Sequence, residues 1–156
     1  MKKILMTPEG LQSLNEEAKR LKSVERPAII KEIAEARAHG DLSENAEYNA
    51  AREQQSLIEG RIKELESFIG RAEVVKVSKL SGSVKFGATV TLEDDETLEK
   101  KTFQIVSEAE ASIERGLLNI GSPLARALIG KDEGDYAEVN TPGGEKSYTI
   151  LEIKYL

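Results

Sequence analysis

The sequence has no cysteine, no tryptophan and only one histidine among its 156 residues. Without cysteine, disulfides and thiolate metal sites are excluded. A single histidine rules out histidine-rich metal sites, and it gives no basis for a Ser/His/Asp catalytic set. The common soft-metal and triad chemistries are therefore not available to this chain.

Long apolar runs are also missing. The run Ile4-Leu5-Met6 before Pro8 is too short for the core of a signal peptide, and no long apolar stretch follows it. We therefore expect a cytoplasmic protein that has no membrane partner.

Basic residues are in deficit, with 22 Lys and Arg against 28 Asp and Glu, so the formal charge is −6. Sequence-independent binding to duplex nucleic acid needs a basic footprint, so that function is disfavoured, although a local basic patch is not. Charged residues make up 32% of the chain and aromatic residues only 4%. This composition favours an elongated, helix-rich part with a large surface.

Two long helical patterns fill the first half of the chain. Thr7-Pro8-Glu9 is a strong helix start in which Thr7 can be the cap. Pro27 predicts a kink or short break near residues 23–26. The first pattern stops at Gly40, and the second starts near Asp41 or Ser43. Together they predict an antiparallel hairpin with an arm of about 48 Å. Its predicted seam comprises Leu11, Leu14, Ala18, Leu21, Ile29 or Ile30, Ile33 and Ala36, then Ala51, Gln54 or Gln55, Ile58, Ile62, Leu65, Ile69 and Ala72.

The apolar period changes to two near residues 75–80, which is typical of strands. Ser122-Pro123 begins a short capped helix that stops at Gly130. The predicted fold class is therefore α+β, with a hairpin domain over 1–76 and a small sheet domain with one helix over 77–156. The predicted strands are 75–77, 84–92, 101–106, 136–139 and 148–153.

A polar stretch, residues 40–48, lies between the two helical patterns and carries three carboxylates. Asp41 and Glu44 are three residues apart, a spacing that favours a capping box. The same spacing lets two carboxylates converge on Mg²⁺, which usually takes one or two carboxylates and completes its shell with water or phosphate. Two carboxylates alone are an incomplete site, so most ligands would come from elsewhere. Glu47 is either a further group near the metal or plain surface.

Arg37 and Arg52 lie within about 15 Å of this stretch along the two arms. They are either solvated or paired with neighbouring glutamates, or they form a clamp for a backbone phosphate. Tyr48 either packs on the hairpin or stacks on a base. His39 is best explained as a surface residue near a helix C-terminus.

Three segments carry a family resemblance. Residues 37–62, which include Gly40-Asp41-Leu42-Ser43-Glu44-Asn45, resemble the signature of the bacterial Gre transcript cleavage factors. Residues 122–131 and 141–145 resemble its second signature, and the likeness extends over essentially the whole chain. The run at residues 50–55 is similar to the GreA branch and less like the more basic GreB branch.

The resemblance implies a coiled-coil hairpin followed by a C-terminal domain of FKBP-like fold. In that family the C-terminal domain docks on RNA polymerase at its secondary channel, and the hairpin carries its acidic tip, residues 40–47 here, to the active centre. Asp41 and Glu44 match family acids that help to hold a second Mg²⁺ jointly with the polymerase. The polymerase then hydrolyses its own transcript near the RNA 3′ end of a backtracked complex.

Further residues take roles from the same resemblance. Arg37 and Arg52 would form a basic patch near the extruded RNA. Asn45, Glu47 and Tyr48 would support the tip, and Ser122 and Pro123 are candidates for polymerase docking. We expect a monomer that is not an enzyme by itself, because the tip holds no complete active site.

Two alternatives remain from the sequence. The first is a non-catalytic regulator that only plugs the polymerase channel, whose effect would not depend on tip charge or Mg²⁺. The second is a prolyl isomerase or chaperone built on the FKBP-like domain. The small number of aromatic residues in that domain disfavours the second alternative.

Overall fold

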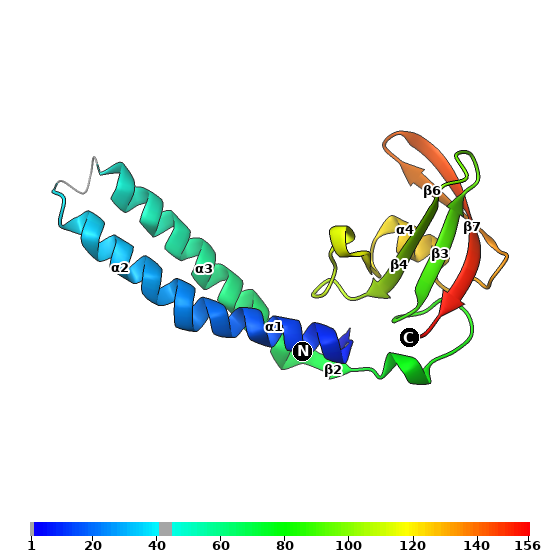
Figure 1. Ribbon diagram of the computed structural model, residues 1–156, viewed down its shortest axis with the longest axis horizontal. Coiled ribbons are helices and arrows are strands. Elements are labelled where there is room, and N and C mark those ends of the chain that lie inside the picture. Colours follow the sequence, from blue (N-terminus) through cyan, green and yellow to red (C-terminus); the bar gives the residue numbers. More distant parts are fainter. Residues whose placement is uncertain (1, 41–44) are drawn as a thin grey trace. The chain divides into compact units, whose positions relative to one another are not determined.

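The computed structural model describes residues 2–40 and 45–156. The chain divides into two units, which are treated separately below. One unit is Gln12–Arg71, and the other joins Met1–Leu11 to Ala72–Leu156. The first is helical and the second contains the main sheet, so the predicted α+β class is confirmed (Figure 1).

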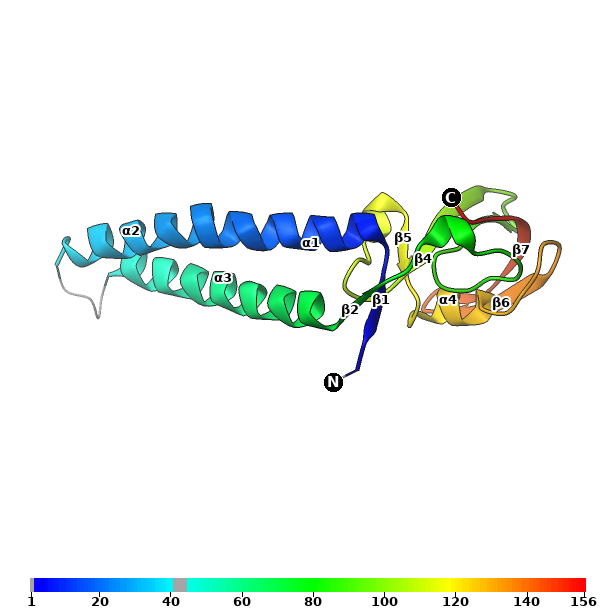
Figure 2. The same cartoon turned by 90° about the horizontal axis from the view of Figure 1, so that it is seen from below.

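The helical unit is the predicted antiparallel hairpin. Its first arm is helical from α1 (Pro8–Arg20) through a π-helical turn (Leu21–Glu25) to α2 (Arg26–Arg37), and α3 (Ala46–Arg71) is the returning arm. Figures 1 and 2 both show α2 and α3 side by side. The buried seam residues are Leu14, Ala18, Leu21, Ile29, Ala36, Ala51, Ile58, Ile62 and Leu65, all of which the apolar spacing predicted.

The predicted kink or short break near residues 23–26 is a local change of helix type: helical hydrogen bonding continues through a π turn, so only the break was wrong. The Arg26 N–H donates to the carbonyl of Leu21, five residues back, which widens the turn. A proline ring conflicts with the carbonyl four residues before it, and a wider turn relieves this conflict at Pro27 without ending the helix. The seam steps eight residues from Leu21 to Ile29, so the π turn absorbs one extra residue.

The predicted start of α1 is confirmed. Thr7 Oγ1 accepts a 3.0 Å hydrogen bond from the Gly10 N–H, which is the expected N-cap. The Glu110 carboxylate in turn accepts from Thr7 N (3.0 Å) and Thr7 Oγ1 (2.5 Å). Burial raises the pKa of Glu110. The first residues of α1 are thereby tied into the sheet-containing unit.

A short parallel pair also belongs to that unit. β1 (Ile4–Met6) pairs with β2 (Ala72–Val74), with Met6 opposite Val74. The strand predicted at 75–77 was misplaced, since β2 ends at Val74 and Val77–Lys79 form a 3₁₀ turn. The sequence did not predict β1, because its partner lies almost seventy residues away.

The main sheet is mixed and has the order β5-β4-β3-β7-β6. β5 runs parallel to β4, and the other neighbours are antiparallel. The predicted strand at 84–92 is shorter, because the chain enters β3 only at Thr89, after Gly87 with a φ of 88°. The strands are β3 (Thr89–Asp94), β4 (Lys100–Val106), β5 (Leu117–Asn119), β6 (Tyr136–Thr141) and β7 (Gly144–Lys154).

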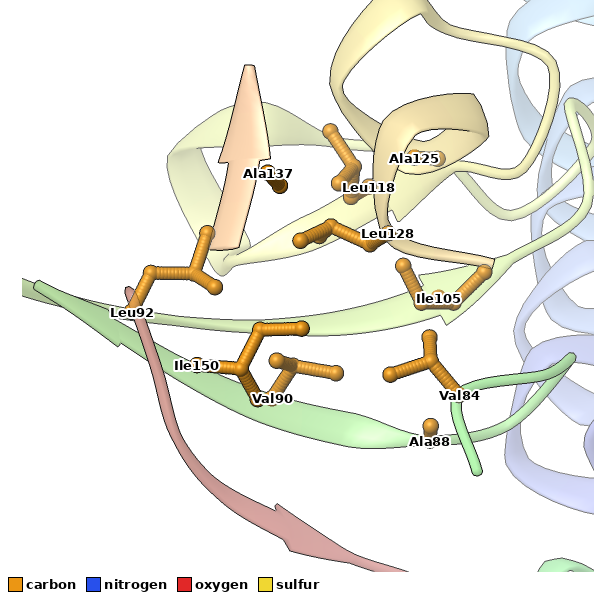
Figure 3. Packing of buried hydrophobic residues seen from close by; sticks show 10 residues of the cluster. All are labelled: Val84, Ala88, Val90, Leu92, Ile105, Leu118, Ala125, Leu128, Ala137 and Ile150. Atoms are coloured by element: carbon orange, nitrogen blue, oxygen red, sulfur yellow. The ribbon is translucent and has the colours of Figure 1, made fainter. Parts of the chain in front are cut away.

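The core of this unit lies between the sheet and α4 (Pro123–Leu128), the predicted capped helix. Ala125 and Leu128 of α4 pack against sheet residues that include Ile105 and Ile150, all fully buried (Figure 3). A second 3₁₀ turn, Ile113–Arg115, precedes β5. In the described ranges, no helix is both long and apolar enough to cross a membrane.

Candidate functional site at the hairpin tip

The predicted metal-binding acids, Asp41 and Glu44, lie outside the described residues. The structure does describe the two helix ends that flank them. α2 ends at Arg37, and Gly40 has a φ of 121°, a backbone conformation that favours glycine. α3 begins at Ala46. The polar stretch thus extends from the residues after α2 into the first turn of α3.

Asn45 joins these termini. Its Oδ1 accepts a 3.0 Å hydrogen bond from the Tyr48 N–H, so Asn45 is the N-cap of α3. Its Nδ2 donates a 2.7 Å hydrogen bond to the carbonyl of Ala36 in the last turn of α2. One amide side chain thus satisfies a free donor of one arm and binds a carbonyl of the other arm, which also accepts from the His39 N–H.

The predicted start of α3 near Asp41 or Ser43 was therefore wrong. The helix starts after Asn45, and Asn45 takes the place that the capping-box interpretation gave to Asp41. Asparagine is among the most favoured N-cap residues. Its side chain accepts from the third N–H of the helix, a donor that has no partner within the helix. The start of α3 thus has its cap without a capping box of Asp41 and Glu44.

Tyr48 lies in the first turn of α3, where it meets two arginines. Arg52 Nη1 donates a 2.8 Å hydrogen bond to Tyr48 Oη, and the Arg52 guanidinium carbon lies 5.7 Å from the centroid of the ring. Hydrogen bonding from Arg52, and then from Arg37 in the other arm, lowers the pKa of the Tyr48 phenol. Arg52 thus contacts the phenol directly, and Arg37 of the other arm also lowers the pKa of that phenol.

The two faces of the hairpin near its tip differ in charge. Arg37 directly follows the buried Ala36, and Arg52 directly follows the buried Ala51. Each side chain is therefore rotated about 100° from the seam, and because the arms are antiparallel both lie on the same flank of the hairpin. The opposite flank is a groove of about 410 Å³, lined by Glu32, Glu35, Ala36, His39, Glu47, Ala50, Ala51 and Gln54. Glu47 and His39 therefore belong to an acidic groove on the side away from the arginines.

No group of three or more His, Cys, Asp or Glu side chains in the described ranges is arranged to hold a metal. A hard cation at the tip would thus be bound by the two carboxylates that the sequence predicted, and its other ligands would come from outside the chain. His39 is exposed, as predicted.

Arginines of the hairpin shaft, the part below the tip, are paired across the arms. Arg26 makes two 2.8 Å hydrogen bonds to Glu59, and Arg61 bonds to Glu17 at 2.7 and 3.0 Å. These arginines lower the pKa of Glu59 and of Glu17, mainly through hydrogen bonding. For Arg37 and Arg52, by contrast, the described part of the chain offers no ion pair with a glutamate.

The predicted docking residues, Ser122 and Pro123, form the start of α4. Ser122 Oγ accepts a 3.3 Å hydrogen bond from the Ala125 N–H, and Pro123 is the first helical residue and is exposed. The cap is a structural role for Ser122, and it leaves the exposed ring of Pro123 available for contact.

Sequence reasoning missed the double role of Asn45 and the separation of charge between the two faces. An asparagine directly before a helical apolar pattern is an N-cap signal, and it identifies the first role. The bond to Ala36 depends on how the arms meet, which no local pattern contains. The charge separation was readable from residues 32–54 once each was placed by its angle from the buried alanines.

Comparison with known proteins identifies the family. Residues 4–74 match the family described as transcription elongation factor, N-terminal, and residues 79–155 match transcription elongation factor, GreA/GreB, C-terminal. Transcription elongation factor GreA of Ruegeria pomeroyi is 69% identical over 99% of both chains. The proteins of that name from Cereibacter sphaeroides and Brucella canis are 66% and 59% identical, each over 100% of both chains.

A solved structure is also similar. The crystal structure of GreA factor homolog 1 of Thermus thermophilus is 26% identical, with a TM-score of 0.47, and covers 98% of this chain and 99% of its own. The family matches span both units of the fold, and the relatives align with it from end to end. The chain belongs to the GreA/GreB family of transcription elongation factors, in its GreA branch.

Proposed function

We propose that this chain activates RNA hydrolysis by a backtracked RNA polymerase and rescues arrested complexes. The hairpin enters the secondary channel, and Asp41 and Glu44 at its tip reach the active centre. The observation that carries this proposal is the N-cap of α3. Because Asn45 caps the helix, the carboxylates of Asp41 and Glu44 are not needed to start it.

The donor chemistry supports a shared magnesium ion. Carboxylate oxygens are the ligands that Mg²⁺ prefers, and two of them leave room for polymerase ligands, water and phosphate. A second ion, when bound, supplies charge stabilisation for the attacking or leaving oxygen of phosphodiester hydrolysis. Asp41 and Glu44 would help to hold that ion and orient a water, so the catalytic site belongs to the polymerase and not to this chain alone.

The length of the hairpin suits a deep site. α3 has 26 residues and therefore extends about 39 Å at ~1.5 Å per residue. Its shaft is held by the apolar seam and by bidentate ion pairs, so the tip is presented by a stiff support. Positioning of this kind is what a factor needs in order to place a catalytic group on another protein.

The remaining roles follow the same proposal. The sheet domain docks the chain, as a monomer, on the polymerase, with Pro123 and the start of α4 in the contact. Arg37 and Arg52 face the extruded RNA on the basic side of the tip, while the acidic groove lies on the other side. The net charge of −6 is compatible with this function, because the main partner is a protein channel.

The test uses backtracked elongation complexes with end-labelled RNA. The purified chain should shorten the RNA from its 3′ end, and Asp41→Asn and Glu44→Gln should abolish that activity while binding to polymerase remains. Glu53→Gln is the matched control, because it removes an exposed acid of α3 and should cleave at the normal rate. Circular dichroism checks that every variant keeps its helix content.

Full cleavage by both acid variants would contradict the proposal. Inhibition that persists in both variants, and that does not change with Mg²⁺ concentration, would instead show that the chain only occupies the channel.

A further inference from the structure

The two arginines near the tip lie on the same flank of the hairpin, and neither forms an ion pair with a described residue. Arg37 and Arg52 come from different arms; Arg52 donates a 2.8 Å hydrogen bond to the Tyr48 hydroxyl, and both arginines lower the pKa of the phenol. Two like charges repel at short range unless an anion lies near them. In the shaft Glu17 and Glu59 are the anions beside the arginines, whereas the described group that accepts from Arg52 at the tip is a neutral phenol.

The three side chains together offer mostly hydrogen-bond donors. An arginine has five N–H donors and no acceptor, and Arg52 uses one of them on Tyr48. The phenol oxygen accepts from arginine and still carries its own O–H. A surface of this kind suits an anion, and the planar guanidinium group matches the oxygens of a phosphate.

The frame behind these side chains is fixed by Asn45. Its amide joins the Tyr48 N–H to the carbonyl of Ala36, the residue before Arg37. The backbone positions from which the phenol and the Arg37 side chain extend are therefore tied across the two arms. The Tyr48 ring also packs beside the Arg52 guanidinium group, which limits the freedom of that long side chain.

We propose that Tyr48 is a positioning residue: its hydroxyl holds the guanidinium groups of Arg37 and Arg52 together, so that the pair binds one backbone phosphate of the extruded RNA. The inference rests on the proposed function, because it takes the RNA 3′ segment of a backtracked complex as the ligand. The ring itself is not the binding group, and the effect of Tyr48 on RNA passes through the arginines.

Tyr48→Phe isolates the hydroxyl, because it keeps the ring, its contact with Arg52 and the helix position. Tyr136→Phe is the matched control, since it removes the hydroxyl of an exposed tyrosine in the sheet unit. Cleavage rates at saturating factor are measured on native RNA and on a series of RNAs, each with one neutral methylphosphonate linkage in the extruded segment. Binding to complexes without extruded RNA is measured in parallel.

We expect one neutral linkage to slow the wild-type chain by about tenfold, the scale of a lost hydrogen bond to a charged group. Tyr48→Phe should slow cleavage of native RNA to a similar extent. Its cleavage rate should fall little further on the RNA whose neutral linkage slows the wild-type chain. Tyr136→Phe should match the wild type on every RNA. Binding to complexes without extruded RNA should be the same for all three chains, and so should helix content.

Several results would overturn the inference. One is cleavage of native RNA by Tyr48→Phe at the wild-type rate. Another is a Tyr48→Phe rate reduction that multiplies fully with the reduction caused by every neutral linkage. A normal Tyr48→Phe with a slow Tyr48→Ala would place the effect in the ring, and weaker binding without extruded RNA would make the role structural. A wild-type chain that stimulates no cleavage at all would contradict the proposed function, and this inference with it.

Discussion

The shaft and the tip of the hairpin use the same kinds of residue in different ways. In the shaft, Arg26 and Arg61 are each locked by two hydrogen bonds to a glutamate of the other arm. At the tip, Arg52 donates to the phenol of Tyr48, and Arg37 of the other arm also lowers the pKa of that phenol. The shaft therefore uses its guanidinium groups to join the arms, and the tip leaves most of its donors unused by the described residues.

The seams of the two regions differ as well. The shaft buries large side chains such as Leu14, Ile58, Ile62 and Leu65, whereas the seam near the tip is made by Ala36 and Ala51. Alanine contributes little apolar area, so the tip gains less stability from packing than the shaft does. Its geometry depends correspondingly more on hydrogen bonds, above all on the two made by Asn45.

The largest expected effect is on the shaft. Leu65 is fully buried, so Leu65→Ala should lower the free energy of unfolding of the hairpin by about 2–5 kcal/mol. Urea unfolding followed by circular dichroism at 222 nm measures this. Leu57→Ala, at a position that is 65% exposed, is the control and should stay within about 0.5 kcal/mol of the wild type. Equal losses in the two variants would remove the distinction between seam and surface.

The next effect is local to the tip. Asn45→Ala should lower the free energy of unfolding by about 1 kcal/mol, the usual value of a lost N-cap. It should also speed amide hydrogen exchange at Tyr48 more than at Ile62. Asn45→Asp keeps a capping oxygen but loses the donor to Ala36, so it separates the cap from the bond between the arms. Unchanged exchange at Tyr48 in both variants would show that Asn45 does not hold the tip.

The smallest effect concerns a shaft ion pair. Arg61→Gln should lower the free energy of unfolding by only about 0.5–1 kcal/mol near neutral pH. The loss is small because both partners of the ion pair are partly exposed. The pKa of Glu17 is lowered by Arg61, so the stability from this pair is present above the ordinary value of 4.5 and is lost as the pH falls through the lowered pKa.

The difference between wild type and Arg61→Gln in urea midpoint should thus shrink in acid. Lys31→Gln, an exposed residue of α2, is the control and should show a small difference at every pH. A difference that grows as the pH falls would contradict the sign of the lowered pKa.

The sequence predicted what depends on neighbours in the chain. The apolar spacing identified the buried seam, Thr7 was correctly predicted to cap α1, and Ser122 caps α4 as its position before Pro123 suggested. These features arise from helical periodicity and from side chains that bond within three residues of themselves. The α+β class followed from the change of period between the two halves.

The sequence did not predict what depends on distant partners. β1 and β5 are three-residue strands whose pairing comes from β2 and β4, and no period can be recognised over such a length. The start of α3 was placed too early because Asp41 and Ser43 are also good capping residues, and Asn45 prevails with an added bond to Ala36. The FKBP-like fold, the metal-binding roles of Asp41 and Glu44, and the docking role of Pro123 stay predictions.

The π turn at Leu21–Glu25 sets the direction in which the side chains of α2 point. One extra residue in a helix rotates the following side chains by about 100°, which is enough to carry a residue from the flank of a hairpin to its seam. The turn is what brings Ile29 to the seam in place of Ala28, and with it the whole of α2. Which face of the tip is basic and which is acidic is therefore decided more than ten residues away, by the number of residues in a single turn.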